Sequence, residues 1–143
     1  MQLVRKPGGA LLLKMLFSRD RMAGGLRAVV SNKSVITSGV VERQWEFSRR
    51  PGAFEAMVAR LRSPAFEPAM VARLNEIRVP TLVVWGRDDI VFPDSESAKF
   101  AEAIPSAKLI IYDQCGHWPA QELPGRTVSD FENFVATLQS SRS

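Results

Sequence analysis

Two short apolar runs, each followed by a polar loop that contains glycine, constrain the fold of this chain most strongly. Residues 81–85 (TLVVW) and 108–112 (KLIIY) are rich in β-branched and other large apolar residues and are short for helices. Continuous apolar runs of this kind are typical of strands that are buried on both faces of a parallel sheet. We therefore predict two parallel strands in the second half of the chain.

Helical patterns follow both predicted strands. Asp94 is expected to cap a helix that runs to about Ile104, with Ala98 and Ala101 on the same face as Ile104. A later helix is predicted behind a pattern that resembles a capping box, Thr127 with Asp130. The apolar stripe of that helix consists of Val128, Phe131, Phe134, Val135 and Leu138. Residues 77–143 thus predict strand–helix–strand–helix, an α/β unit with right-handed crossovers.

Residues 1–76 carry only helical patterns. Leu11, Leu12, Met15 and Leu16 recur at helical spacing, and Leu26, Val29 and Val30 continue this pattern after an expected break at Gly24-Gly25.

Thr37 or Ser38 is expected to cap a helix that carries Val41 and Trp45 and ends at Pro51-Gly52. Residues 53–61 are nearly repeated as residues 65–74 with Pro68 inserted. This repeat predicts two short amphipathic helices, or one helix whose boundary is set by Pro68.

The charge is distributed unevenly along the chain. Residues 1–79 hold 14 Lys/Arg and 6 Asp/Glu, a net charge of +8, whereas residues 80–143 hold 5 and 9, a net charge of −4. The basic half could bind nucleic acid, but its arginines are scattered along helical patterns and do not alternate with aromatic residues. Solvated helix faces are the better interpretation, and we expect no nucleic-acid partner.

Composition also limits the compartment and the bound groups. No apolar run approaches the roughly 20 residues that a membrane-spanning helix needs, so we expect no membrane association. A single cysteine, Cys115, excludes an internal disulfide and fits a reducing compartment, so we expect a cytoplasmic protein. One histidine and no cysteine pair leave no metal-ligand spacing.

The two polar loops carry the residues with catalytic chemistry. Asp89 lies four residues past Trp85, and His117 lies five past Tyr112. Because the carboxyl ends of parallel strands lie at the same edge of a sheet, both residues are expected in neighbouring loops. A carboxylate beside an imidazole holds its tautomer and stabilises the imidazolium. Gly86 and Gly116 are expected to let the backbone turn sharply at each strand end.

These loops resemble those of the α/β-hydrolase fold family, in which the nucleophile, acid and histidine follow one another along the chain. Residues 77–86 (IRVPTLVVWG) and 86–93 (GRDDIVFP) resemble the acid strand and loop, which assigns the acid to Asp89 rather than Asp88. Residues 116–119 (GHWP) and 122–124 (ELP) resemble the histidine loop. The resemblance implies a partial α/β-hydrolase fold, with a helical cap-like region in residues 1–76 and the C-terminal part of the core in residues 77–143.

The sequence departs from the family pattern upstream. It contains no Gly-x-Ser-x-Gly elbow and no oxyanion-hole segment of the His-Gly type. Cys115 is too close to His117 to meet it productively and is interpreted as a small buried thiol, while Ser95 and Ser97 are interpreted as first-turn helix residues. We therefore expect a truncated chain, a misplaced start codon or one piece of a split protein.

The resemblance implies a hydrolase of an ester or related bond, with His117 as general base and Asp89 as its orienting acid. Trp118, Phe92 and Trp45 could line a pocket for a small apolar acyl or aromatic substrate, and core packing is the alternative interpretation. No cofactor is implied. The expected partners are a missing N-terminal half or a second copy of the chain. The alternative function is that of an inactive fragment that self-associates through exposed strand edges.

Overall fold

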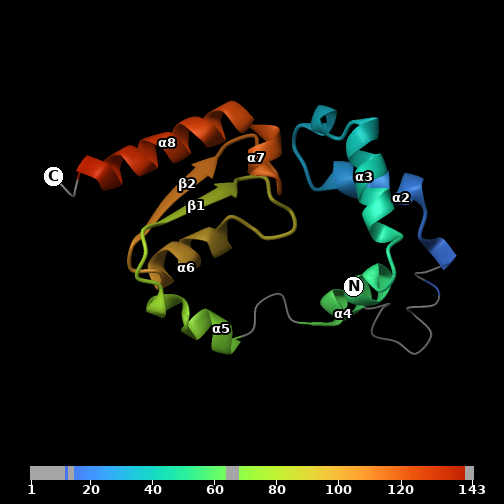
Figure 1. Ribbon diagram of the computed structural model, residues 1–143, viewed down its shortest axis with the longest axis horizontal. Helices are drawn as coiled ribbons and strands as arrows, with labels where there is room; N and C mark the ends of the chain where they lie inside the picture. The colour runs from blue at the N-terminus through green and yellow to red at the C-terminus, as the bar shows by residue number, and fades with distance from the viewer. Residues whose placement is uncertain (1–11, 13–14, 64–67, 141–143) are drawn as a thin grey trace. The chain divides into compact units, whose positions relative to one another are not determined.

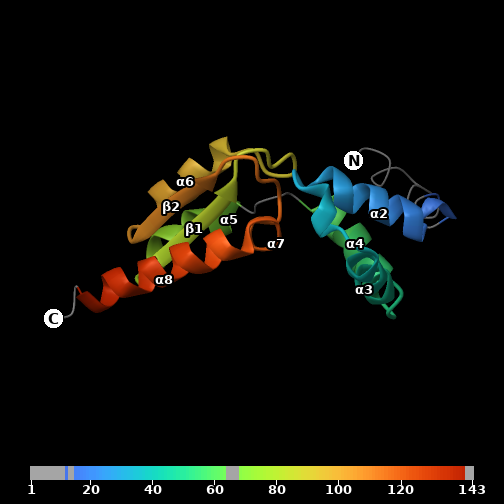
Figure 2. The same ribbon diagram turned by 90° about the horizontal axis from the view of Figure 1, so that it is seen from above.

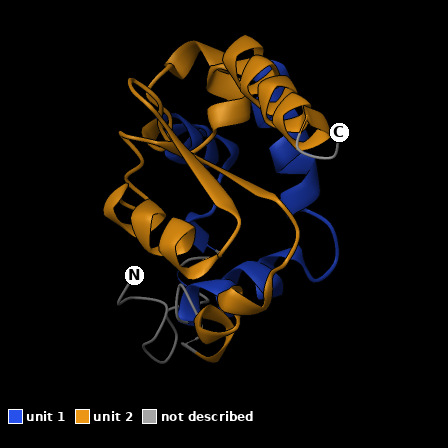
Figure 3. Cartoon of the chain, turned by 90° about the vertical axis from the view of Figure 1, so that its left-hand side faces the viewer, with its two compact units in different colours: residues 1–27, 36–67 blue, residues 28–35, 68–143 orange. Residues whose placement is uncertain are grey.

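The computed structural model describes residues 12, 15–63 and 68–140, and the chain divides into two compact units. Unit 1 comprises residues 1–27 and 36–67, and unit 2 comprises residues 28–35 and 68–143 (Figure 3). The predicted helix that carries Leu11, the first residues of the second repeat copy and the last three residues lie wholly or partly outside the described residues.

Unit 2 is built around a two-stranded parallel sheet. Strand β1 spans Thr81–Gly86 and strand β2 spans Ala107–Tyr112, and Thr81 pairs with Ala107 at the start of the register. Helix α6, Ser95–Ala103, connects the two strands, and helix α8, Pro124–Ser140, follows them. The ribbon views show α6 and α8 on opposite sides of the strands (Figures 1 and 2). The predicted strand–helix–strand–helix order with parallel strands is confirmed, and the architecture is a partial α/β-hydrolase fold.

Short elements complete unit 2. They are the 3₁₀ helix η2 (Lys33–Val35), helix α5 (Pro68–Ala72), the 3₁₀ helix η3 (Leu74–Glu76) and helix α7 (Pro119–Glu122). Pro68 is the first residue of α5, so a helix boundary lies at Pro68, as the repeat predicted. Sequence analysis did not predict α7, whose first residue is Pro119, a favourable residue at the first position of a helix.

Asp94 stands at the predicted N-cap position of α6, whereas the predicted capping box of α8 is wrong. Asp94 makes no side-chain cap hydrogen bond, because its carboxylate is 3.4 Å from the Arg87 guanidinium. Helix α8 begins three residues before Thr127, at Pro124, so Thr127 lies inside the helix and donates its hydroxyl to Leu123 O. Asp130 instead accepts the Tyr112 hydroxyl at 2.9 Å. Each of the three polar side chains therefore bonds a partner other than the expected cap: Arg87 for Asp94, Leu123 O for Thr127 and the Tyr112 hydroxyl for Asp130.

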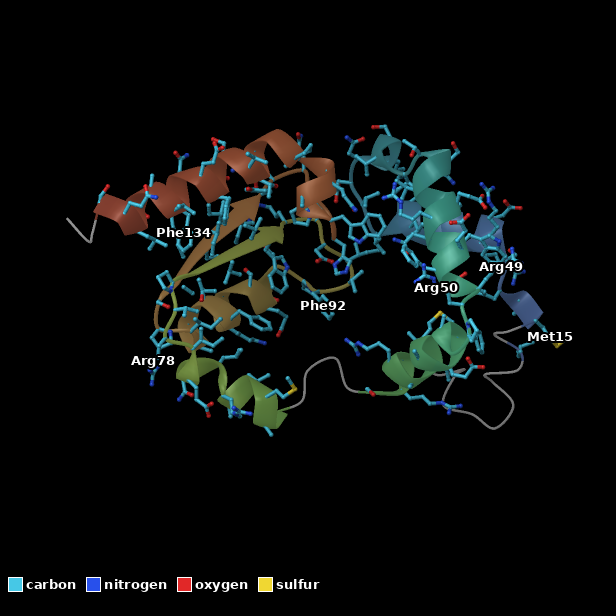
Figure 4. All side chains as sticks on the ribbon, viewed as in Figure 1. Met15, Arg49, Arg50, Arg78, Phe92 and Phe134 are labelled. Atoms are coloured by element: carbon cyan, nitrogen blue, oxygen red, sulfur yellow. The ribbon has the colours of Figure 1, made fainter. Side chains whose placement is uncertain are left out.

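The core of unit 2 lies between the strands and their covering helices. Its most buried apolar residues are Val30, Ile104, Tyr112, Cys115 and Phe134. Phe134 lies on the side of α8 that faces the strands (Figure 4). Ser97, rather than the predicted Ala98, is buried on α6, and Val128 and Phe131 of the predicted α8 stripe are 55% and 57% exposed.

Helices are the regular secondary structure of unit 1 in its described residues. This unit contains most of α2 (Arg19–Ala28), and α3 (Ser38–Ser48) and α4 (Ala53–Arg62). The predicted break at Gly24-Gly25 is wrong, because α2 continues through both glycines and a helix interior tolerates glycine at a modest cost. The predicted cap of α3 is confirmed, since the Thr37 side chain accepts a hydrogen bond from Val40 N–H. Among the described helices of both units, none is long and apolar enough to span a membrane.

Candidate active site

Asp89 and His117 meet beyond the carboxyl ends of the two strands. Asp89 lies in the acid loop, defined here as residues 87–94 between β1 and α6, and His117 lies in the histidine loop, residues 113–118 between β2 and α7. The distance between Asp89 Oδ2 and His117 Nδ1 is 2.8 Å. The parallel register brings the two strand ends together, because Gly86 pairs with Tyr112, the last residue of β2.

The Asp89 carboxylate is fixed by bonds within its own loop. Its Oδ1 accepts hydrogen bonds from Val91 N–H at 2.7 Å and Phe92 N–H at 3.0 Å. Phe92 O in turn accepts the Trp85 indole N–H at 2.9 Å, which ties the loop to the strand. The Asp89 side chain is only 6% exposed. Both carboxylate oxygens therefore have partners, and Oδ2 is held toward the imidazole.

The His117 imidazole is held at one nitrogen and open at the other. Its side chain is 29% exposed, and in the part of the chain that the structure describes no protein group hydrogen-bonds Nε2. The Phe92 ring lies 5.6 Å from the imidazole, centroid to centroid. Because a carboxylate only accepts hydrogen bonds, Nδ1 is the donor and the lone pair of the neutral ring lies on Nε2. This arrangement equips Nε2 to take a proton from a hydroxyl group.

The two glycines of this region serve close packing rather than a sharp turn. Neither Gly86 nor Gly116 has a positive φ. A Cβ at Gly86 would overlap the carbonyl oxygens of Cys115 and Gly116, and a Cβ at Gly116 would lie 2.5 Å from Val29 O. The prediction that these glycines allow a sharp turn is therefore wrong. Each glycine lies where another backbone segment leaves no room for a side chain.

Neither Cys115 nor the serines of α6 form a nucleophile beside His117. Cys115 is fully buried, and burial raises the pKa of its thiol to about 11, which leaves little thiolate at neutral pH. Ser97 is fully buried and donates its hydroxyl to Asp94 O, and Ser95 starts α6. The interpretation of these three residues as structural is confirmed.

Glu122 belongs to the motif that resembles the histidine loop, but the sequence predicted no role for it. Glu122, at the end of α7, is 5% exposed and accepts hydrogen bonds from the N–H groups of Gly116 and Trp118 on either side of His117. A glutamate five residues past a histidine gives no signal of burial by itself. Only the return of α7 against the histidine loop brings its carboxylate to these amides.

A scan against models of protein families matches the alpha/beta hydrolase fold family over residues 6–122. The chain belongs to this family. The match covers most of the chain, including both loops of the candidate site.

The curated proteins that the chain resembles include a hydrolase of a dienoate and a hydrolase of a semialdehyde. The chain is 30% identical over 118 residues to a 2-hydroxy-6-oxo-6-phenylhexa-2,4-dienoate hydrolase of Comamonas testosteroni, covering 77% of this chain and 41% of that protein. It is 30% identical over 117 residues to a 2-hydroxymuconate semialdehyde hydrolase of Pseudomonas putida, covering 78% and 42%.

Solved structures of the family are similar in fold. The meta-cleavage product hydrolase CumD of Pseudomonas fluorescens IP01 superposes with a TM-score of 0.69 at 25% identity, over 85% of this chain and 46% of that chain. The carbazole-degradation serine hydrolase CarC superposes with a TM-score of 0.71 at 23% identity, over 84% and 48%. The chain thus spans less than half the length of each relative named here.

Of the three aromatic residues expected to line a pocket, two lie in unit 2 and one lies in unit 1. Phe92 and Trp118 belong to unit 2 and flank the candidate site in sequence and structure, with Phe92 against the imidazole. Trp45 belongs to α3 of unit 1, where its ring packs 5.7 Å from Phe17. Among the described residues no cluster of three or more His, Cys, Asp or Glu side chains is arranged to hold a metal ion.

Proposed function

We propose that this chain provides the acid and the histidine of a hydrolase site, with His117 as general base and then general acid and Asp89 as the residue that orients it. The observation that carries the proposal is the 2.8 Å contact between Asp89 Oδ2 and His117 Nδ1, which leaves Nε2 exposed to a reacting group. An imidazole held in this way accepts a proton at Nε2, and the carboxylate stabilises the imidazolium that forms.

The reaction follows from that proton transfer. A hydroxyl group attacks the carbonyl carbon of the substrate while His117 Nε2 takes its proton, and the imidazolium then returns a proton to the leaving group. The sequence has no Gly-x-Ser-x-Gly elbow, so the nucleophile and the oxyanion donors belong to a polypeptide segment outside it. Residues 1–76 take the part of a helical cap, and residues 77–143 contribute the acid and histidine elements of the core. The reaction as proposed requires no cofactor.

The substrate class proposed is a small aromatic or apolar carbonyl compound, cleaved at an ester or a carbon–carbon bond. The relatives named above include a hydrolase of a dienoate that carries a phenyl group and a hydrolase of a semialdehyde. The Phe92 ring beside the imidazole supports an aromatic lining for the reacting end of such a substrate. Trp118 and Trp45 remain proposed contacts of the substrate.

A second candidate function is that of an inactive chain that associates with a second copy. In the described residues β1 pairs with β2 alone, and a strand with one unpaired edge is a template for another strand. The exposed side chains of Val128 and Phe131 on α8 add apolar surface that association would cover.

The first test is hydrolysis of p-nitrophenyl acetate by the purified chain, with its molar mass recorded by light scattering. Four proteins are compared: the parent, His117→Ala, Asp89→Asn, and Glu132→Gln as a control on the exposed face of α8. Where a nucleophile is supplied, general base catalysis predicts that the parent and Glu132→Gln exceed His117→Ala by about 100-fold.

The assay is repeated with the N-terminal segment of the Comamonas testosteroni relative added, because a supplied nucleophile could complete the site. Rates that do not depend on His117 under both conditions would refute the proposal. In that case, a dimeric or larger molar mass would favour the second candidate function.

A further inference from the structure

Glu122 is buried without a cationic partner in the described part of the chain, and backbone amides surround its carboxylate. Oε1 accepts from Gly116 N–H at 2.9 Å and from Trp118 N–H at 3.3 Å. Oε2 accepts from Ser31 N–H at 2.8 Å and from Asn32 N–H at 3.0 Å. Removing a carboxylate from water is costly unless its lone pairs are satisfied, so four amide donors mark a site that the fold has built around this side chain.

The two donors at Oε1 lie on either side of His117. The His117 N–H itself donates to Val29 O at 2.8 Å. Three consecutive backbone amides of the histidine loop are therefore bonded to acceptors outside the loop. These bonds fix the position of the His117 Cα and the direction in which its imidazole leaves the backbone.

The two donors at Oε2 belong to the strap, defined here as residues 28–35, from the last residue of α2 to the end of η2. The strap lies in unit 2 although the residues before and after it belong to unit 1. Its Ser31 hydroxyl also donates to Asp88 Oδ2 at 3.0 Å, in the acid loop next to Asp89. The strap is thus bonded to both loops of the candidate site.

The strap also packs against the histidine loop without a gap. A Cβ added at Gly116 would lie 2.5 Å from Val29 O, 2.8 Å from Val30 Cα and 2.9 Å from Ser31 N. All three atoms are backbone atoms, which do not turn aside as a flexible side chain does. The contact between the two segments is therefore set by the main chain, and Glu122 is the side chain that bonds them together.

We propose that Glu122 is a positioning residue, which binds the strap to the histidine loop and so holds His117 Nδ1 against Asp89. It does not touch the reacting atoms and acts through the backbone of residues 116–118. The consequence for catalysis rests on the proposed function above. The positioning itself is a property of the folded chain and can be measured without a substrate.

The test uses the imidazole of His117, which is the single histidine of the sequence and gives one set of ring signals. The ¹⁵N-labelled chain is compared with Glu122→Gln and with the control Glu132→Gln. Glutamine keeps the size of Glu122 but offers one acceptor oxygen in place of two, so one pair of amides loses its acceptor. The ring ¹⁵N shifts report which nitrogen carries the proton, and a downfield proton signal reports the bond from Nδ1 to Asp89.

We expect the parent and Glu132→Gln to show the tautomer protonated at Nδ1 with its downfield signal. Glu122→Gln is expected to lose that signal and to populate both tautomers, while the amide signals of β2 and α8 stay in place. An unchanged Nδ1 signal in Glu122→Gln would overturn the proposal. Loss of the signal, with no hydrolysis that depends on His117 either alone or with the added N-terminal segment, would leave the positioning role standing and remove the proposed function.

A second measurement needs no substitution and covers the case in which Glu122→Gln does not fold. The amides of Ser31, Asn32, Gly116 and Trp118 are followed by hydrogen exchange in the unmodified chain. Bonds to a buried carboxylate predict protection of about 100-fold over an unstructured chain for all four. Exchange of these amides at the unstructured rate would overturn the proposal.

Discussion

Replacing Gly116 with alanine would force the strap away from the histidine loop. The new Cβ would lie 2.5 Å from Val29 O and 2.8 Å from Val30 Cα. Ordinary contact lies near 3.5 Å, so the two segments must separate by roughly 1 Å. The bond from His117 N–H to Val29 O, now 2.8 Å, would then exceed the length of a good hydrogen bond.

The expected cost follows from these two effects. Overpacking of a tight contact costs roughly 1–3 kcal/mol, and each hydrogen bond lost adds about 1 kcal/mol. We expect Gly116→Ala to lower the free energy of unfolding by about 3 kcal/mol. Gly125→Ala in the first turn of α8 is the matched control, because no atom lies within 4 Å of its added Cβ. This control is expected to stay within about 0.5 kcal/mol of the parent or to become more stable.

Urea unfolding followed by tryptophan fluorescence and far-UV circular dichroism measures both variants. The slopes with denaturant should match that of the parent, so that a change of midpoint reports stability. Equal midpoints for the parent and Gly116→Ala would refute the close packing of the strap against the histidine loop. A loss of stability in Gly125→Ala as large as in Gly116→Ala would show that the effect does not depend on the added Cβ contact.

Three further predictions concern other parts of the chain. Asp89→Asn is expected to reduce any hydrolysis that depends on His117 by roughly 10²–10⁴-fold, because an amide no longer holds the imidazole tautomer, and initial rates of ester hydrolysis check this. Cys115 is expected to resist Ellman's reagent at pH 8 in the folded chain and to react at once in urea. The pKa of the Cys115 thiol in the folded chain, about 11, lies above the ordinary value of 9.0. The contribution of the neutral thiol to the free energy of unfolding is therefore fully present below pH 9 and is lost as pH rises through 11, and urea midpoints at several pH values would detect this loss. Thr37→Ala should destabilise unit 1 by about 1 kcal/mol through loss of the α3 cap, whereas Thr37→Ser should retain it, as thermal unfolding would measure.

Local sequence pattern was sufficient for the strands and for most of the helices. The runs 81–85 and 108–112 lie in β1 and β2, because short apolar segments of this composition have few other ways to be buried. The pairing of Asp89 with His117 also followed from the sequence. Parallel strands carry their following loops to one edge of the sheet, and the spacing within each loop was enough to place both side chains there.

Sequence pattern gave wrong predictions of hydrogen bonds where a polar side chain could bond more than one partner. Asp94 and Thr127 both match capping patterns in the sequence, yet the Asp94 carboxylate pairs with Arg87, and Thr127 lies inside α8 and bonds Leu123 O, just before that helix. The free energies of a cap and of a competing hydrogen bond are similar, about 1 kcal/mol each. The choice between them depends on which partners the tertiary fold brings near.

The sequence by itself determined the strand–helix–strand–helix order of residues 77–143, the parallel pair of strands and the meeting of Asp89 with His117 at the strand ends, because each depends on local patterns and on the rule for parallel strands. The tertiary structure alone decided how that pair is held. Glu122 and the strap are about 90 residues apart in sequence, and the bonds between them exist only because α7 turns back toward the histidine loop. The donors of a buried carboxylate can come from segments that are distant in sequence, so local periodicity does not predict them.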